Sequence, residues 1–316
     1  MSSGLLAMPA PPQPGRLGPG PIPAALVDSL DLALVRRVSG LMPGERPATR
    51  PGAGSELEQL RAYGYGDDVR HLDPAATART GEPHVRVHVA ERELEAWLVL
   101  DASPSMEFGT ADRTKADVAE GAALVMGRLA GRRGNRLGLA VAGESVRILA
   151  PRQGRTGQMQ LLHALRAQPC PDGSPAASLS DALSACERVA GRRGLIVVVS
   201  DFLGDDGWTV PLGRLAARHA VLAVEVRDPR ESELPAVGHV PFACPETRAQ
   251  MLVDTSDRGV REAFASAAAE QRVGITRAIR RTGALHVTLS TAGPWLRTLG
   301  AALRGAAAAG IAGGRR

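Results

Sequence analysis

The chain has 316 residues, 44% of them apolar and 22% charged, a balance that excludes a wholly disordered protein. The net charge is only +5, basic and acidic residues are interleaved, and 3% of residues are aromatic, which argues against a nucleic-acid-binding surface. No apolar run approaches the roughly 18 residues of a membrane span, and three scattered cysteines form no disulfide or metal-binding pattern. We therefore expect a cytoplasmic protein without a membrane span.

The N-terminal part of the chain is predicted to lie outside the main fold. Residues 1–23 are rich in proline and glycine and indicate a flexible leader. Residues 24–92 are predicted to form a small region of helix and strand. It contains a helix at 25–41, a short second helix at about 56–62 and, where apolar residues alternate strictly, a strand at 84–89.

The main fold is predicted for residues 93–304, where short apolar runs alternate with amphipathic stretches. The strands are expected at 96–100, 137–141, 146–149, 195–200, 221–226 and 285–289. Helices fall between them, one of them at 179–189, and a long one ends in the arginines Arg277, Arg280 and Arg281. Such alternation predicts an α/β fold with a doubly wound, mostly parallel sheet and helices on both faces. Residues 305–316 are predicted to be a disordered tail.

Acidic and hydroxyl side chains follow two of the predicted strands. Asp101, Ser103 and Ser105 form a D-x-S-x-S pattern in which alternate side chains point the same way, and Asp201 follows the strand at 195–200. Because ligands bind at the carboxyl ends of parallel strands, these residues should share one crevice. Their hard oxygen atoms suit Mg²⁺ or Mn²⁺, although either pattern taken singly also fits an ordinary capping turn or loop acid.

These segments resemble the metal-ion-dependent adhesion site of a von Willebrand factor A domain. Residues 54–106, which contain GDD-x-R, ART-G and D-x-S-x-S, resemble the signature of the bacterial family catalogued as domain of unknown function 58. The resemblance covers about residues 25–230. It implies a von Willebrand A-like α/β fold, no enzymatic activity, and partnership with a MoxR-type AAA+ ATPase.

The resemblance also implies a set of metal ligands. In such sites a threonine before a helix supplies a further oxygen atom, but the matching run ASLSDAL has Ala177 at that position and Ser178 beside it. Metal affinity is therefore expected to be weakened. The implied ligands are Asp101, Ser103, Ser105, Ser178 and Asp201.

The acidic run at 67–73 has two interpretations. His71, which lies among carboxylates, could act as a general base. We favour a structural role, in which Arg70 and Arg79 pair with the neighbouring carboxylates.

The sequence as a whole predicts a non-catalytic protein-interaction module. Its Mg²⁺ or Mn²⁺ ion would accept a carboxylate from a partner protein, and the chain would serve a MoxR-type AAA+ ATPase as an adaptor. Two alternatives stay open: a metal-assisted hydrolase or phosphatase with His71 or Asp201 as base, and a metal-free scaffold. The chain contains no G-x-x-x-x-G-K-[ST], G-x-S-x-G or H-E-x-x-H motif that would indicate a common enzyme class.

Overall fold

The computed structural model describes residues 17–27, 30, 57–65, 67–88, 95–130, 135–166, 177–204, 206–243 and 249–313. The chain divides into two compact units. One unit comprises residues 42–93, and the other comprises residues 1–41 together with residues 94–316. The larger unit contains the predicted sheet.

A six-stranded sheet with the order β10-β7-β6-β3-β4-β5 runs through the larger unit. All neighbouring strands are parallel except β4 and β5, which are antiparallel. The strands are β3 (Glu95–Asp101), β4 (Arg136–Ala142), β5 (Val146–Gln153), β6 (Gly194–Ser200), β7 (Ala220–Arg227) and β10 (Leu285–Ser290). The observed order and direction confirm the predicted α/β class, and each strand predicted for the main fold lies within one of these.

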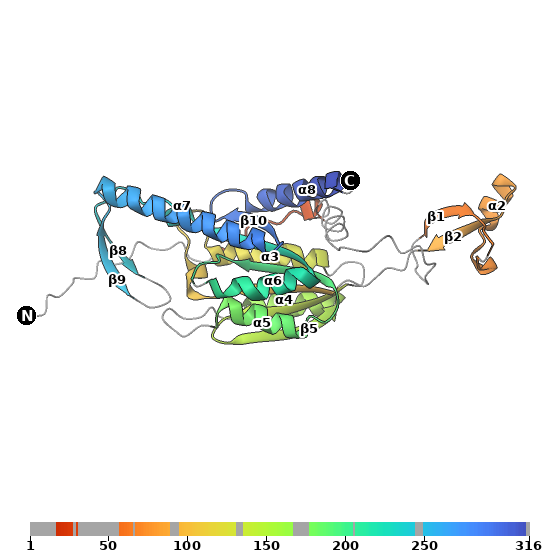
Figure 1. Cartoon of the computed structure of the whole chain (residues 1–316), viewed down its shortest axis with the longest axis horizontal. Helices are drawn as coiled ribbons and strands as arrows, with labels where there is room; N and C mark the ends of the chain where they lie inside the picture. Colours follow the sequence, from red (N-terminus) through yellow and green to blue (C-terminus); the bar gives the residue numbers. More distant parts are fainter. Residues whose placement is uncertain are drawn as a thin grey trace, which may run out of the picture. The chain divides into compact units, whose positions relative to one another are not determined.

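Helices cover both faces of this sheet, as Figure 1 shows. On one face lie α5 (Leu179–Val189), α6 (Thr209–Arg218) and α7 (Arg258–Arg281). On the other lie α3 (Lys115–Ala130), α4 (Gly154–Arg166) and α8 (Trp295–Gly313). The central strands are therefore buried from both sides, which explains why every residue of β6 is buried.

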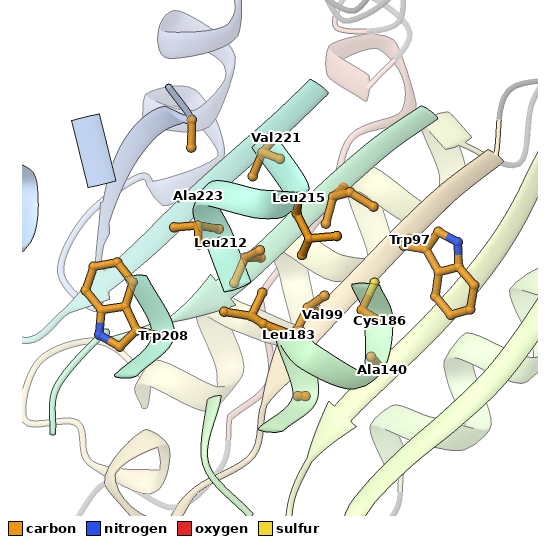
Figure 2. Close-up of a cluster of buried hydrophobic side chains, with 14 of the residues drawn as sticks. Trp97, Val99, Ala140, Leu183, Cys186, Trp208, Leu212, Leu215, Val221 and Ala223 are labelled. Carbon is orange, nitrogen blue, oxygen red and sulfur yellow. The ribbon is translucent and has the colours of Figure 1, made fainter. Parts of the chain in front are cut away.

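The core between the sheet and the α5–α6–α7 layer is built from side chains that alternate along the strands (Figure 2). Trp97 and Val99 of β3 and Val221 of β7 face this layer, and Leu183 of α5 and Leu212 of α6 fill the space between them. All five are 3% exposed or less. This packing fixes the position of the strand ends from which the candidate site is built.

Two features at the C-terminal side differ from the sequence predictions. An antiparallel hairpin of β8 (His239–Ala243) and β9 (Gln250–Asp254) was not predicted; it lies at the N-terminal end of α7 in Figure 1. Helix α8 runs through Gly313, so the predicted disordered tail is wrong for residues 305–313. Alanine is the strongest helix former, and the alanine run in this segment favours a helix.

The smaller unit contains a two-stranded antiparallel sheet of β1 (Leu57–Ala62) and β2 (His84–His88), with α2 (Pro74–Thr80) between the strands. The strand predicted at 84–89 is confirmed as β2. The helix predicted at about 56–62 is wrong, because these residues form β1 and pair with β2. Leucines three positions apart fit a helix, but pairing with a strand more than twenty residues away decides the conformation.

The acidic run of the smaller unit has a structural role that differs in its partners from the predicted one. Asp67 forms an ion pair with Arg61 at 2.6 Å rather than with Arg70 or Arg79. Asp68 accepts from the Arg70 N–H at the start of the 3-10 helix η1 (Val69–His71), and Asp73 caps α2 by accepting from the Ala76 N–H. Most of the predicted leader and of the helix at 25–41 lies outside the described residues.

Candidate functional site

The loop after β3 gathers the D-x-S-x-S residues around one carboxylate. Asp101 Oδ1 accepts from the Ser103 backbone N–H at 2.9 Å, and the hydroxyl oxygens of Ser103 and Ser105 lie 3.1 Å apart. The loop then enters the 3-10 helix η2 (Pro104–Glu107), whose Pro104 and Met106 are buried. Alternate residues of this loop therefore present polar side chains on one side and anchor the loop on the other.

The end of β6 brings the second carboxylate to the same place. The Ser105 hydroxyl donates to Asp201 Oδ2 at 2.9 Å, and the hydroxyl of Ser200 donates to Asp101 Oδ2 at 2.6 Å. Two hydrogen bonds thus join residues about a hundred positions apart in the sequence. The structure therefore brings together Asp101, Ser103, Ser105 and Asp201.

A tight turn after β6 fixes the direction of Asp201. Phe202 has φ of 55°, a left-handed backbone conformation that is uncommon for a residue with a side chain. Its ring is buried and packs edge-on against Trp208 with ring centroids 5.0 Å apart. Asp201 Oδ1 accepts from the Leu203 N–H at 3.0 Å, so core packing and this hydrogen bond together hold the turn.

A buried ammonium group, which the sequence analysis did not single out, completes the cluster. Lys115 Nζ lies 2.6 Å from Asp201 Oδ2 and 2.5 Å from Glu231 Oε1. The side chain of Lys115 is 1% exposed and that of Asp201 is 2% exposed. Lys115 is also the only lysine in the chain, and this was the one sequence signal that could have drawn attention to it.

The position of Lys115 follows from how α3 begins. The Thr114 N–H donates to Asp117 Oδ2 and the Asp117 N–H donates to the Thr114 hydroxyl, so the two residues cap the helix reciprocally. Lys115 is the first residue of α3, where the helix dipole disfavours a positive charge. Its ammonium is held there by two carboxylates instead.

The two strand-end aspartates have opposite pKa shifts. Burial and the charge of Asp201 raise the pKa of Asp101, against hydrogen bonds from Ser200 and Ser103. Burial also acts to raise the pKa of Asp201, but the Lys115 ammonium together with hydrogen bonds from Leu203 and Ser105 outweighs it, so that pKa is lowered. Burial acts to lower the pKa of Lys115, and the charges of Asp201 and Glu231 outweigh it, so the pKa is raised. The cluster thus keeps Asp201 ionised and Lys115 charged.

The ion pairs of Lys115 continue into a wider network of charged groups near the end of β7. Glu231 lies in the 3-10 helix η4 (Pro229–Glu231), and its second oxygen, Oε2, lies 2.5 Å from Arg272 Nη2. Arg272 Nη1 lies 2.9 Å from Glu225 Oε1. The pKa of Glu225 falls to about 2 because hydrogen bonds from His286 and Arg227 and the nearby arginine charges outweigh its burial. Acids and bases therefore alternate from Asp201 to Glu225, and no isolated charge is left in this chain of contacts.

Ser178 has a different environment from the other predicted ligands. It caps α5: its hydroxyl donates to Asp181 Oδ2 at 2.8 Å and accepts from the Asp181 N–H at 3.1 Å. Among the interactions of the described residues, none joins Ser178 to Asp101 or Asp201. The Ala177 N–H, at the position of the usual threonine, donates to the carbonyl of Gly143.

The donor set fits a hard divalent cation on the Asp101 side of the cluster. Asp101, Ser103 and Ser105 offer one carboxylate and two hydroxyls from a half-buried loop. Asp201 Oδ2 already accepts from Lys115 and Ser105, so Asp201 fits as an indirect partner, through Ser105 or water. Within the described ranges there is no group of three or more His, Cys, Asp or Glu suited to a metal, so hydroxyl oxygens would be needed as ligands.

No helix in the described part of the chain is both long and apolar enough to cross a lipid bilayer.

Several solved structures resemble this chain at low sequence identity. A conserved hypothetical protein, BatB from Bacteroides thetaiotaomicron, is 14% identical with a TM-score of 0.40, covering 68% of this chain and 99% of that one. A von Willebrand factor type A protein from Catenulispora acidiphila is 12% identical with a TM-score of 0.37, covering 69% of this chain and 43% of that one.

Relatives of much higher sequence similarity are uncharacterised proteins of mycobacteria. Rv1480 of Mycobacterium tuberculosis and Mb1516 of Mycobacterium bovis are each 42% identical over 274 residues, which is 86% of this chain and 86% of theirs. The family model described as protein of unknown function DUF58 matches residues 59–274. Because this match covers more than half of the sequence, the chain belongs to the DUF58 family.

Proposed function

We propose that this chain is a non-catalytic protein-interaction module that binds its partner at the carboxyl edge of the sheet. The observation that carries the proposal is the hydrogen-bonded convergence of Asp101, Ser103, Ser105 and Asp201 from the ends of β3 and β6. Two strand ends that present oxygen donors to one point are suited to binding a ligand.

The module would use a divalent cation, Mg²⁺ or Mn²⁺, held by Asp101, Ser103 and Ser105. When bound there, the ion would supply an exchangeable position for a carboxylate oxygen of the partner protein. Asp201 would act indirectly: its carboxylate accepts a hydrogen bond from the Ser105 hydroxyl and so orients that hydroxyl. Ser178 would contribute only if its capping interaction with Asp181 were given up, which favours weak binding of the cation.

The partner we propose is a MoxR-type AAA+ ATPase, for which the chain would be an adaptor in protein maturation or complex assembly. Support for this partner is the resemblance of residues 54–106 to the family signature. A contact between a metal ion and a carboxylate is directional and reversible, and such a contact suits an assembly that must form and separate repeatedly.

The alternative of a metal-assisted hydrolase has less support. A general base needs a pKa near the working pH, whereas the Lys115 ammonium lowers the pKa of Asp201 and occupies its Oδ2 atom. Binding rather than catalysis is therefore the better account of this cluster.

The test is titration of Mg²⁺ and Mn²⁺ into the full chain by calorimetry and thermal melting. We expect saturable binding that Asp101→Asn abolishes, because the amide keeps the shape of the side chain but loses the charge. The control is Glu270→Gln, which removes an exposed carboxylate on α7 and should leave binding unchanged.

Capture of a MoxR-type ATPase, with and without EDTA, tests the partner. Capture that EDTA and Asp101→Asn both abolish would support the adaptor. Absence of metal binding, with unchanged melting in EDTA, would contradict the cation site and favour the metal-free scaffold.

A further inference from the structure

A pocket lined by arginines lies alongside the C-terminal half of α7. It has a volume of about 620 Å³, and its walls include Arg227 of β7 and Arg272, Arg277, Arg280 and Arg281 of α7. Neither the D-x-S-x-S loop nor any other residue of the candidate cation site lines it. We propose that this pocket binds an acidic segment of a partner protein through its carboxylates.

The charge of the pocket is not balanced from within. Arg227 and Arg272 are paired with Glu225, but Arg277, Arg280 and Arg281 are exposed, and none of the three forms an ion pair with a described residue. None of the described residues that line the pocket is acidic. Three guanidinium groups are therefore available to an anionic ligand.

The spacing of these residues gathers them on one side of the helix. Arg277 and Arg281 are four positions apart, and so are Thr276 and Arg280, so the two pairs form adjacent rows along α7. Like charges at such spacing destabilise a helix, and the helix dipole offsets this only near the last turn. Stabilisation of the end of α7 explains why Arg280 and Arg281 are present there. It does not explain why Arg227, which lies on a strand, lines the same pocket.

The chemistry of the walls selects among anionic ligands. A guanidinium group presents a planar fork of donors that matches a carboxylate or a phosphate. Among the described residues, no aromatic side chain lines the pocket on which a nucleic-acid base could stack. Val273, 55% exposed, and Thr276 add a small apolar and hydroxyl surface that suits a peptide chain. A segment with several consecutive Glu or Asp residues fits these features.

The test uses the full chain in EDTA, so that its outcome does not depend on the cation site. A fluorescein-labelled octaglutamate peptide is titrated by fluorescence anisotropy against the wild type and against the triple variant Arg277→Gln, Arg280→Gln, Arg281→Gln. We expect the dissociation constant to rise about tenfold in this variant, because three exposed ion pairs are lost. Raised salt should weaken the wild-type complex.

The matched control is Arg152→Gln, Arg155→Gln, Arg188→Gln, which removes three exposed arginines outside the pocket and changes the net charge equally. We expect a loss of peptide affinity of less than about threefold in this control.

Equal losses of affinity in both triple variants, or absence of peptide binding, would overturn the proposal. Tighter binding of an eight-residue oligothymidylate through the same three arginines would also overturn it, in favour of a nucleic acid. Equal melting temperatures of both variants show that folding is intact, and the single variant Arg277→Gln repeats the test if they differ.

Discussion

Lys115 determines the charge balance of the strand-end cluster. Its ammonium pairs with the buried carboxylate of Asp201 and with the carboxylate of Glu231, whose side chain is 13% exposed. A buried ion pair contributes little net stability compared with an apolar replacement of both partners, but loss of one partner leaves an uncompensated charge. Removal of the Lys115 ammonium should therefore lower the free energy of unfolding by more than the net contribution of its ion pairs to stability.

We predict that Lys115→Met lowers the free energy of unfolding by about 3–5 kcal/mol at pH 7, because the buried Asp201 carboxylate loses its ammonium partner, whereas Glu231 keeps its ion pair with Arg272. Urea unfolding followed by tryptophan fluorescence measures this change. The control is Arg258→Met, which breaks the exposed pair with Glu262 and should cost less than about 1 kcal/mol. Similar effects of both substitutions would mean that the Lys115 pair is well solvated, contrary to the structure.

At the scale of single elements, the close approach of β6 to β3 depends on a glycine. A Cβ atom on Gly194, the first residue of β6, would lie 1.8 Å from the backbone carbonyl oxygen of Glu95 in β3. Backbone atoms in a paired strand have little freedom to move away. The register of the two strands that carry Asp101 and Asp201 therefore depends on the absence of a side chain at this position.

We predict that Gly194→Ala lowers the free energy of unfolding by about 2 kcal/mol or more, through overpacking between the two strands. Gly191→Ala, three residues earlier, meets no atom within 4 Å and should be neutral or stabilising by up to about 1 kcal/mol. Chemical denaturation of the two variants side by side measures the contrast. A neutral effect of Gly194→Ala would show that the strands can separate locally without cost.

The bounds of helix α5 could be predicted from local sequence, although Ser178 was assigned to the metal site rather than to the cap, and some of the strands could not be predicted. Ser178 and Asp181 form a capping box from residues three positions apart, and α5 has the bounds that were predicted. β1 was predicted to be a helix because its partner strand is remote, and the β8–β9 hairpin was missed for want of a clear alternating pattern. Elements that local hydrogen bonds define are predictable, whereas elements that need a distant partner are less so.

At the scale of the whole molecule, the larger unit is held by a core that joins the sheet to three helices. Leu212 of α6 is fully buried in this core, beside Leu215 and Leu183 in Figure 2. Interiors of this kind are close-packed, so a missing side chain leaves a cavity that the surroundings fill only in part. The positions of the strand ends depend on this packing.

We predict that Leu212→Ala lowers the free energy of unfolding by about 2–5 kcal/mol, from lost burial and the cavity. Val210→Ala, on the same helix but 58% exposed, should change it by less than about 0.5 kcal/mol. Thermal and urea unfolding distinguish the two. Comparable small effects would show that the layer of α5 and α6 contributes little to the stability of the sheet.

The sequence by itself determined the α/β class, the six strands of the sheet, the family and the polar residues that directly follow β3. It could do so because each depends on local signals: apolar runs of strand length, helical periodicity, and side chains that directly follow a strand. Asp101 and Asp201 were placed in one crevice because parallel strands end at one edge of a sheet.

Only the tertiary structure decided what surrounds these aspartates. Three charged residues from separate elements come into contact only when the layers pack: Lys115, Glu231 and Arg272. No spacing in the sequence therefore predicts their contacts. The arginine pocket depends equally on packing, because Arg227 lies on β7 and its companions on α7. Burial determines these long-range ion pairs. A charged group that is removed from water is unstable unless an opposite charge lies beside it, and the packing of distant elements decides which group that is.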